Sequence, residues 1–176
     1  MARSVPVRSG SVRSKVPDGI DALQFLKREH NGLKRLFTEL RRTAPRAHRK
    51  RRELLDRIVT DLEVHARIEE DLFYPAITEV PYTRHMIEEA RADHDAVREV
   101  VTELEALAPT DRAFPMKADE LREIALAHIL EEEDDVFPLA SRLGSERLED
   151  LGAALAARRR QLGEHRAVTA RRSAAA

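Results

Sequence analysis

Residues 65–75 read HARIEEDLFYP, and residues 128–138 read HILEEEDDVFP. Each stretch places a glutamate four residues after a histidine and a proline ten residues after it. Two further histidines, His30 and His94, are each followed, eight residues later, by the start of the tripeptide Thr-Glu-Leu. The first pair of motifs is offset by 63 residues and the second pair by 64. The sequence therefore predicts two copies of one helical hairpin, related by a pseudo-twofold axis.

The apolar residues around these motifs recur every three or four positions, which is the pattern of amphipathic helices. Four such stripes run through residues 26–40, 58–76, 87–108 and 121–139, and no segment alternates with the period of a strand. Long helices joined by short links form antiparallel bundles. We therefore expect an all-α fold, an up-down-up-down four-helix bundle with a short fifth C-terminal helix.

The helix ends carry signals of their own. Asp18, with Asp21 three residues later, predicts the N-cap of the first helix. Gly144 followed by Ser145 predicts a helix stop and a new start. The expected division of the chain is a flexible basic arm over residues 1–18, the bundle over residues 19–140, an additional C-terminal helix over residues 141–164, and a flexible basic tail over residues 165–176.

The composition excludes several classes of protein. The chain of 176 residues has no cysteine, which rules out disulfides, thiolate nucleophiles and iron–sulfur clusters. No apolar run approaches about 18 residues, and the N-terminus lacks the apolar stretch of a secretory signal, so we expect a cytoplasmic protein without membrane contact. The body is acidic and both ends are basic, which argues against a nucleic-acid-binding core. We expect the basic run at residues 46–52 to be solvated; the sequence identifies no protein partner.

Polar residues interrupt all four apolar stripes. Each stripe contains one histidine, and the second and fourth also contain the glutamate of an HxxxE pair, whose two members project from one helix face. Counted from the turns that join neighbouring helices, the histidines lie at about the same height, because each helical residue adds about 1.5 Å. The six residues of this layer are His30, His65, Glu69, His94, His128 and Glu132.

Four imidazoles and two carboxylates that face one another form a site large enough for two metal ions. Mixed nitrogen and oxygen ligands suit iron, manganese or zinc, and the set is too rich in nitrogen for calcium or magnesium. Unpaired glutamates in a bundle core would be costly or become protonated, and a bound cation resolves that cost. A lone histidine on an apolar face is commonly a hydrogen-bonded core residue, but four at one height with two duplicated HxxxE pairs favour metal binding.

The remaining histidines, His48, His85 and His165, are expected in solvent. Six acids flank the two HxxxE pairs, and we expect most of them to form a solvated face, although any of them can hydrogen-bond to a metal ligand from behind. These acids are Glu70, Asp71, Glu131, Glu133, Asp134 and Asp135.

The full pattern, H…HxxxE…H…HxxxE, resembles that of hemerythrin-like proteins of the HHE cation-binding type. The resemblance covers about residues 19–140. It implies a four-helix bundle that holds a non-haem di-iron centre. In this chain the pattern is carried by His30, His65, Glu69, His94, His128 and Glu132. We expect two of the histidines on each iron, the two glutamates between the irons, and an oxo or hydroxo bridge. Family members variously bind oxygen reversibly, sense iron or oxygen, react with nitric oxide or break down peroxide.

Two positions depart from the oxygen-carrying members of that family. Those proteins have a second histidine one turn before the one on the third helix, where this chain has Ala90. They also place a bridging aspartate five residues after the last histidine, where this chain has Glu133. A missing imidazole leaves more open positions on the metals, so these departures favour redox reactivity or sensing over oxygen carriage.

The leading hypothesis is a di-iron protein that reacts with O2, hydrogen peroxide or nitric oxide, with a catalase-like breakdown of peroxide in stress defence as its enzymatic form. A metal-binding sensor or storage module without turnover would use the same ligands. A metal-free helical adaptor would need the six polar residues to satisfy one another. Ferritin-like oxidases are disfavoured because no glutamate stands three residues before any site histidine, and the HExxH signature of zinc proteases is absent.

Overall fold

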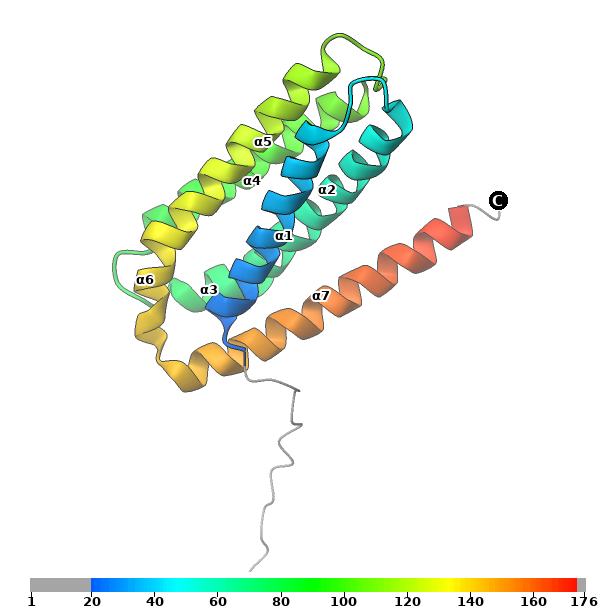
Figure 1. Ribbon diagram of the computed structural model, residues 1–176. Helices are drawn as coiled ribbons and strands as arrows, with labels where there is room; N and C mark the ends of the chain where they lie inside the picture. The colour runs from blue at the N-terminus through cyan, green and yellow to red at the C-terminus, as the bar shows by residue number, and fades with distance from the viewer. Residues whose placement is uncertain (1–19, 174–176) are drawn as a thin grey trace, which may run out of the picture.

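The structure is a computed structural model that describes residues 20–173, with side chains described as far as residue 164. Four long antiparallel helices form the bundle seen in Figure 1. They are α1 (Ala22–Arg42), α2 (His48–Ile68), α4 (Arg84–Glu105) and α5 (Phe114–Glu131). No strand occurs between residues 20 and 173. The expected all-α four-helix architecture is confirmed.

The second and fourth helices of the bundle each change pitch at the glutamate of the HxxxE pair. A π-helical turn, η1 (Glu69–Phe73), follows α2, and η2 (Glu132–Val136) follows α5. The chain then returns to α-helix in α3 (Tyr74–Ile77) and α6 (Phe137–Ala140). Each α-segment has a proline in its first turn, which cannot donate the backbone hydrogen bond that would continue a regular ladder. Isolated π turns are frequent at functional sites, and here the duplication reproduces the turn at both copies.

The first helix begins later than its sequence signal suggests. Asp21 is the N-cap of α1, and its carboxylate accepts a hydrogen bond of 2.8 Å from the backbone N–H of Gln24. The prediction of Asp18 as the N-cap was therefore wrong: the cap lies three residues later, at Asp21, whose carboxylate reaches the third N–H of the helix. Asp18 itself lies outside the described residues.

One member of the basic run at residues 46–52 is not solvated. Arg51 is buried, and its guanidinium donates to the backbone carbonyls of Leu40 and Thr43 at the end of α1. It also lies over the ring of Phe114, 5.4 Å from the ring centroid. Arg51 thus satisfies carbonyls that the C-terminus of α1 leaves without helical partners.

The core consists of two apolar clusters at different heights along the bundle. One cluster gathers residues from Leu33 to Leu40 of α1 and the facing parts of α2, α4 and α5. The other gathers Leu26, the segments around η1 and η2, and the start of the last helix. Along the chain, His30, His65, His94 and Glu132 each lie between a residue of one cluster and a residue of the other, whereas His128 lies just inside the first cluster and Glu69 just inside the second.

The C-terminal helix is longer than expected. After the short 3-10 turn η3 (Ser141–Leu143), Gly144 adopts a φ of 84° and α7 runs from Ser145 to Ser173. The predicted fifth helix is present, but it continues beyond its expected end at residue 164, because no proline interrupts this stretch and its alanines, arginines and leucines favour helix. Gly163 alone does not end it.

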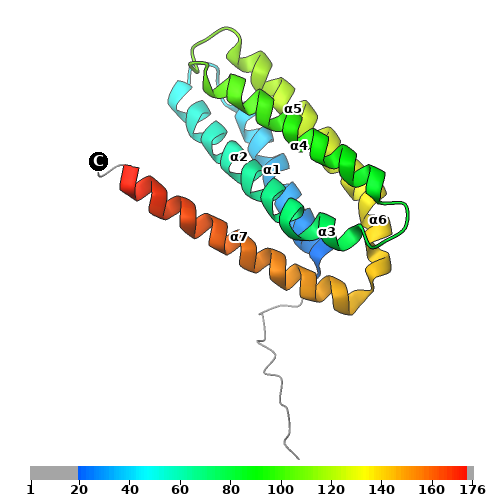
Figure 2. The same cartoon turned by 180° about the vertical axis from the view of Figure 1, so that it is seen from behind.

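Helix α7 covers one side of the bundle. It contacts α1, α2 and η1, and Figures 1 and 2 show it running beside the lower parts of α1 and α2 before it diverges from them. Its buried residues Leu148, Leu151 and Leu155 belong to the second apolar cluster. Among the described residues, no helix has the length and apolar character required to span a membrane.

The close approach of α7 to α1 requires a glycine, which gives a first prediction. A Cβ at Gly152 would lie 2.4 Å from the backbone oxygen of Ile20, so Gly152→Ala should destabilise the fold by about 1–3 kcal/mol through overpacking. Gly163→Ala, on the same helix with no atom within 4 Å of the added carbon, is the matched control and should be neutral or slightly stabilising. Denaturant unfolding measures both, and equal stabilities of the two variants would contradict this packing.

Candidate metal centre

The structure brings the six predicted residues together in the centre of the bundle. All six are buried, with exposed fractions between 0% and 4%. They form two overlapping groups of potential metal ligands that share one carboxylate, Glu69. The first group is His30, His65, Glu69 and Glu132, and the second is Glu69, His94 and His128.

The two carboxylates lie between the two pairs of histidines. Glu69 Oε2 is 3.2 Å from Nε2 of His65 and 3.4 Å from Nε2 of His94. Glu132 Oε2 is 3.3 Å from Nε2 of His30 and 3.6 Å from Nε2 of His128. Each glutamate therefore reaches one histidine of each hairpin, which is the position that a bridging carboxylate requires.

Several polar atoms of this layer have no hydrogen-bond partner within the described residues. They are Nε2 of His30, both ring nitrogens of His65, both carboxylate oxygens of Glu69, and Oε2 of Glu132. Buried polar groups are almost always satisfied, and one that is left unpaired costs about 1–3 kcal/mol. Imidazole nitrogens and carboxylate oxygens are also the ligands that transition metals prefer, so this donor set fits a bound cation.

The electrostatics of the layer also call for positive charge. Burial and the neighbouring carboxylate of Glu132 raise the pKa of Glu69 well above its usual range. Burial also tends to raise the pKa of Glu132, but the nearby imidazoles of His128 and His30 outweigh it and lower this pKa below its usual range. Burial, together with nearby His30, lowers the pKa of His65. Without a cation the two carboxylates compete for protons, whereas a metal stabilises both as anions.

The outer nitrogens of two histidines are held by acids that follow the HxxxE glutamates. Nδ1 of His30 donates to Glu133 at 2.8 Å, and Nδ1 of His94 donates to Glu70 at 3.0 Å. Because an ionised carboxylate only accepts, this contact assigns the proton to Nδ1 and leaves Nε2 free to face the centre. The hydrogen bond from His94 lowers the pKa of Glu70 to about 2.

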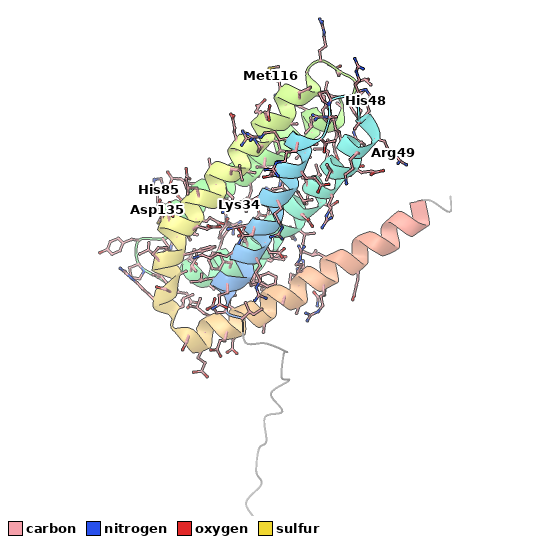
Figure 3. The ribbon with its side chains drawn as sticks, viewed as in Figure 1. Lys34, His48, Arg49, His85, Met116 and Asp135 are labelled. Atoms are coloured by element: carbon pink, nitrogen blue, oxygen red, sulfur yellow. The ribbon has the colours of Figure 1, made fainter. Side chains whose placement is uncertain are left out.

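Each of these acids is in turn held by a cation one turn beyond the histidine. Lys34 donates to Glu133, and Arg98 donates to Glu70. Lys34 and Arg98 are offset by the same 64 residues as the two histidines. Figure 3 shows Lys34 on α1, midway along the bundle. The duplication seen in the ligand pattern thus extends to the residues that orient the ligands.

Tyr74 was not identified from the sequence. It is fully buried, its hydroxyl donates to Oε1 of Glu132 at 2.8 Å, and the oxygen lies 3.5 Å from Nε2 of His94. Its twofold equivalent is Phe137, which stacks on His30 but has no hydroxyl. Tyr74 is not one of the periodic apolar residues of its stripe, and the signal that could have found it is a hydroxyl among otherwise apolar neighbours.

The other polar residues near the motifs are mostly exposed. His48 and His85 lie in solvent at opposite ends of the bundle, as Figure 3 shows; the side chain of His165 lies outside the described residues. Glu131, Asp134 and Asp135 are exposed as expected. Asp71 is paired with Arg158 of α7, and of the six flanking acids Glu70 and Glu133 are the two that hydrogen-bond to the site histidines.

Comparison with known proteins gives one family. Residues 21–140 match the model of the hemerythrin HHE cation-binding domain. An uncharacterized protein of Mycobacterium tuberculosis, Rv2633c, is 34% identical over 150 residues, covering 81% of this chain and 88% of that protein. The crystal structure of an HHE cation-binding domain-containing protein, the Rv2633c homologue from Mycobacterium kansasii, has a TM-score of 0.74 at 28% identity, covering 81% of this chain and 87% of that one.

A protein of Nostoc named DNA nickase is also similar. It is 27% identical over 147 residues, which cover 80% of this chain but 41% of that protein. The match thus corresponds to less than half of the Nostoc protein.

The hydroxyl of Tyr74 gives a second prediction. Tyr74→Phe should lower the free energy of unfolding of the metal-free protein by about 1–3 kcal/mol, because Oε1 of the buried Glu132 loses its donor. The ring itself should fit, since phenylalanine occupies the twofold-related position 137. Tyr82→Phe is the control, as Tyr82 is 88% exposed. Denaturant titration that finds both variants as stable as the parent would refute this role of Tyr74.

Proposed function

The chain belongs to the hemerythrin HHE cation-binding family, and we propose that its buried centre holds two iron ions and reacts with O2, hydrogen peroxide or nitric oxide. The observation that carries this proposal is the set of buried ring nitrogens and carboxylate oxygens without partners in the described chain. These atoms come from α1, α2 and the two π turns η1 and η2, and they converge on one layer.

The proposed ligands divide by hairpin. His30 and His65 of the first hairpin would hold one ion, and His94 and His128 of the second would hold the other. Glu69 and Glu132 lie between the two pairs and would be shared. The distances of 3.2–3.6 Å from their Oε2 atoms to the imidazole nitrogens support this assignment, as does the place of Glu69 in both ligand groups.

Other residues of the chain would keep these ligands in place. Glu133 and Glu70 fix the orientation of His30 and His94 by accepting from Nδ1. Tyr74 holds one oxygen of Glu132 and leaves the other toward the centre. Ligands supported in this way bind metal more tightly and lose affinity when the supporting residue is removed.

Breakdown of hydrogen peroxide is the reaction that we favour. It reduces one peroxide to water and oxidises another to O2, and a pair of irons, when bound, supplies the two-electron exchange that this requires. The small side chain of Ala90 leaves space beside His128 and Glu132, where the twofold-related residue is the larger Leu26. A small molecule can therefore approach the layer from this side. Such an activity would serve in defence against oxidative or nitrosative stress.

Metal content tests the ligand assignment. Single substitutions His30→Ala, His65→Ala, His94→Ala and His128→Ala should each lower the iron bound per chain, because each removes a nitrogen from the layer. His48→Ala and His85→Ala, which alter exposed histidines, are the controls and should retain the parental iron content. Elemental analysis of protein purified from iron-replete cells measures both sets. Equal loss in the two sets would overturn the assignment.

Oxygen evolution tests the reaction. Iron-loaded protein should release O2 from hydrogen peroxide, and Glu69→Ala or Glu132→Ala should abolish the release because each removes a carboxylate shared by both ions. Ala90→His, which adds an imidazole beside the centre, should slow it. An oxygen electrode measures the rates at matched metal content. If the protein binds iron but releases no more O2 than a free-iron control, the proposed metal binding holds and the proposed peroxide reaction is contradicted.

A further inference from the structure

An open groove leads from solvent to the metal layer on the side formed by α4, α5 and η2. Its cavity volume is about 310 Å³. This is enough for a hydrated ion, since a water molecule occupies about 30 Å³ in the liquid. Ala90 lines the groove, and His128 and Glu132 of the layer lie at its inner end.

The groove is strongly acidic. Glu89, Asp93, Glu131 and Asp135 line it, and no lysine or arginine does so among the described residues. The exposed His85 lies 3.3 Å from Glu89, and Nδ1 of His128 lies 3.4 Å from Asp93. Glu131 and Asp135 are exposed and have no ion-pair partner in the described part of the chain.

The twofold-related face on the other side of the bundle is covered by α7. Shifting Glu89, Glu131 and Asp135 by the repeat offsets of 64 and 63 gives Phe25, Ile68 and Leu72. These three apolar residues belong to, or pack against, the apolar cluster that contains Leu151 and Leu155 of α7.

The fourth acid of the groove, Asp93, corresponds to Glu29, which is neutralised by Arg159 of α7 at 2.6 Å. The repeat therefore has one side sealed by α7 and one side that is open and acidic. The two sides differ in their surface residues, because the metal-ligand layer between them is the same in both repeats.

An atom at the inner end of the groove points to a cation. Glu132 is 1% exposed, lines the groove, and its Oε2 has no hydrogen-bond partner within the described chain. The four carboxylates do not attract a neutral molecule such as O2, and they repel an anion. A divalent cation is attracted by the rim and meets unsatisfied ligands at the end of the path.

We propose that this groove is the route by which divalent metal ions reach the buried centre, and that α7 closes the twofold-related route. The proposal rests on the proposed metal binding. The four acids of the groove are not needed as ligands in the loaded centre: they raise the local concentration of the cation at the surface and pass it to His128 and Glu132. Removing the outer charges should therefore change the rate of loading and leave the final occupancy unchanged.

The test follows the uptake of Co²⁺ by the full-length protein after its metal has been removed with a chelator. The ligand-field absorption of Co²⁺ reports binding in a stopped-flow instrument, without any assay of activity. The test variant is Glu89→Gln/Glu131→Gln/Asp135→Asn. The matched control is Glu99→Gln/Glu149→Gln/Asp150→Asn, which removes three exposed acids outside the groove and changes the net charge equally.

The test variant should bind the parental amount of Co²⁺ at about a tenfold lower rate in low salt. The difference should shrink as salt screens the charges. The control variant should load at nearly the parental rate. Parental loading rates in the test variant, or equal slowing of the control, would overturn the proposed route while leaving metal binding intact. Absence of bound Co²⁺ in the parent at the end point would overturn both proposals.

Discussion

The fold depends on how two carboxylates and four imidazoles are accommodated in the middle of an apolar bundle. They lie between two hydrophobic clusters, and six of their polar atoms lack a hydrogen-bond partner in the described chain. Burying such groups opposes folding, because a charge that leaves water must be compensated by a partner. Every other feature of the centre is arranged around this layer: the two π turns start at its glutamates, and the flanking acids hold its histidines from outside.

The internal repeat makes the two hairpins depend on each other. His30 of the first hairpin is held by Glu133 of the second, and His94 of the second is held by Glu70 of the first. Each glutamate of the layer likewise lies near a histidine of both hairpins. One hairpin alone therefore supplies neither a complete ligand set nor the residues that orient it. The symmetry ends at the periphery, where α7 covers the first hairpin and leaves the second open.

The sequence was sufficient to predict the bundle and the residues that meet at its centre. Helical periodicity with one histidine in each apolar stripe places His30 and its counterparts on inward faces, and the duplicated HxxxE pair is too specific a pattern to arise by chance. The residues that support the layer were harder to find. Glu70 lies next to Glu69, and its role depends on a π turn that changes which side chains face inward. Tyr74 is indistinguishable from an apolar core residue until its hydroxyl is placed.

The length of α7 was also missed, because its C-terminal part has no regular apolar stripe by which to recognise a helix.

The measurement that tests the central claim most directly is the free energy of unfolding of the same protein with and without metal. Iron-loaded protein under anaerobic conditions and chelator-stripped protein are compared by denaturant titration. With free metal about a hundredfold above its Kd, we expect the loaded form to be more stable by about 2.7 kcal/mol or more. Equal stability of the two forms would contradict a buried metal centre.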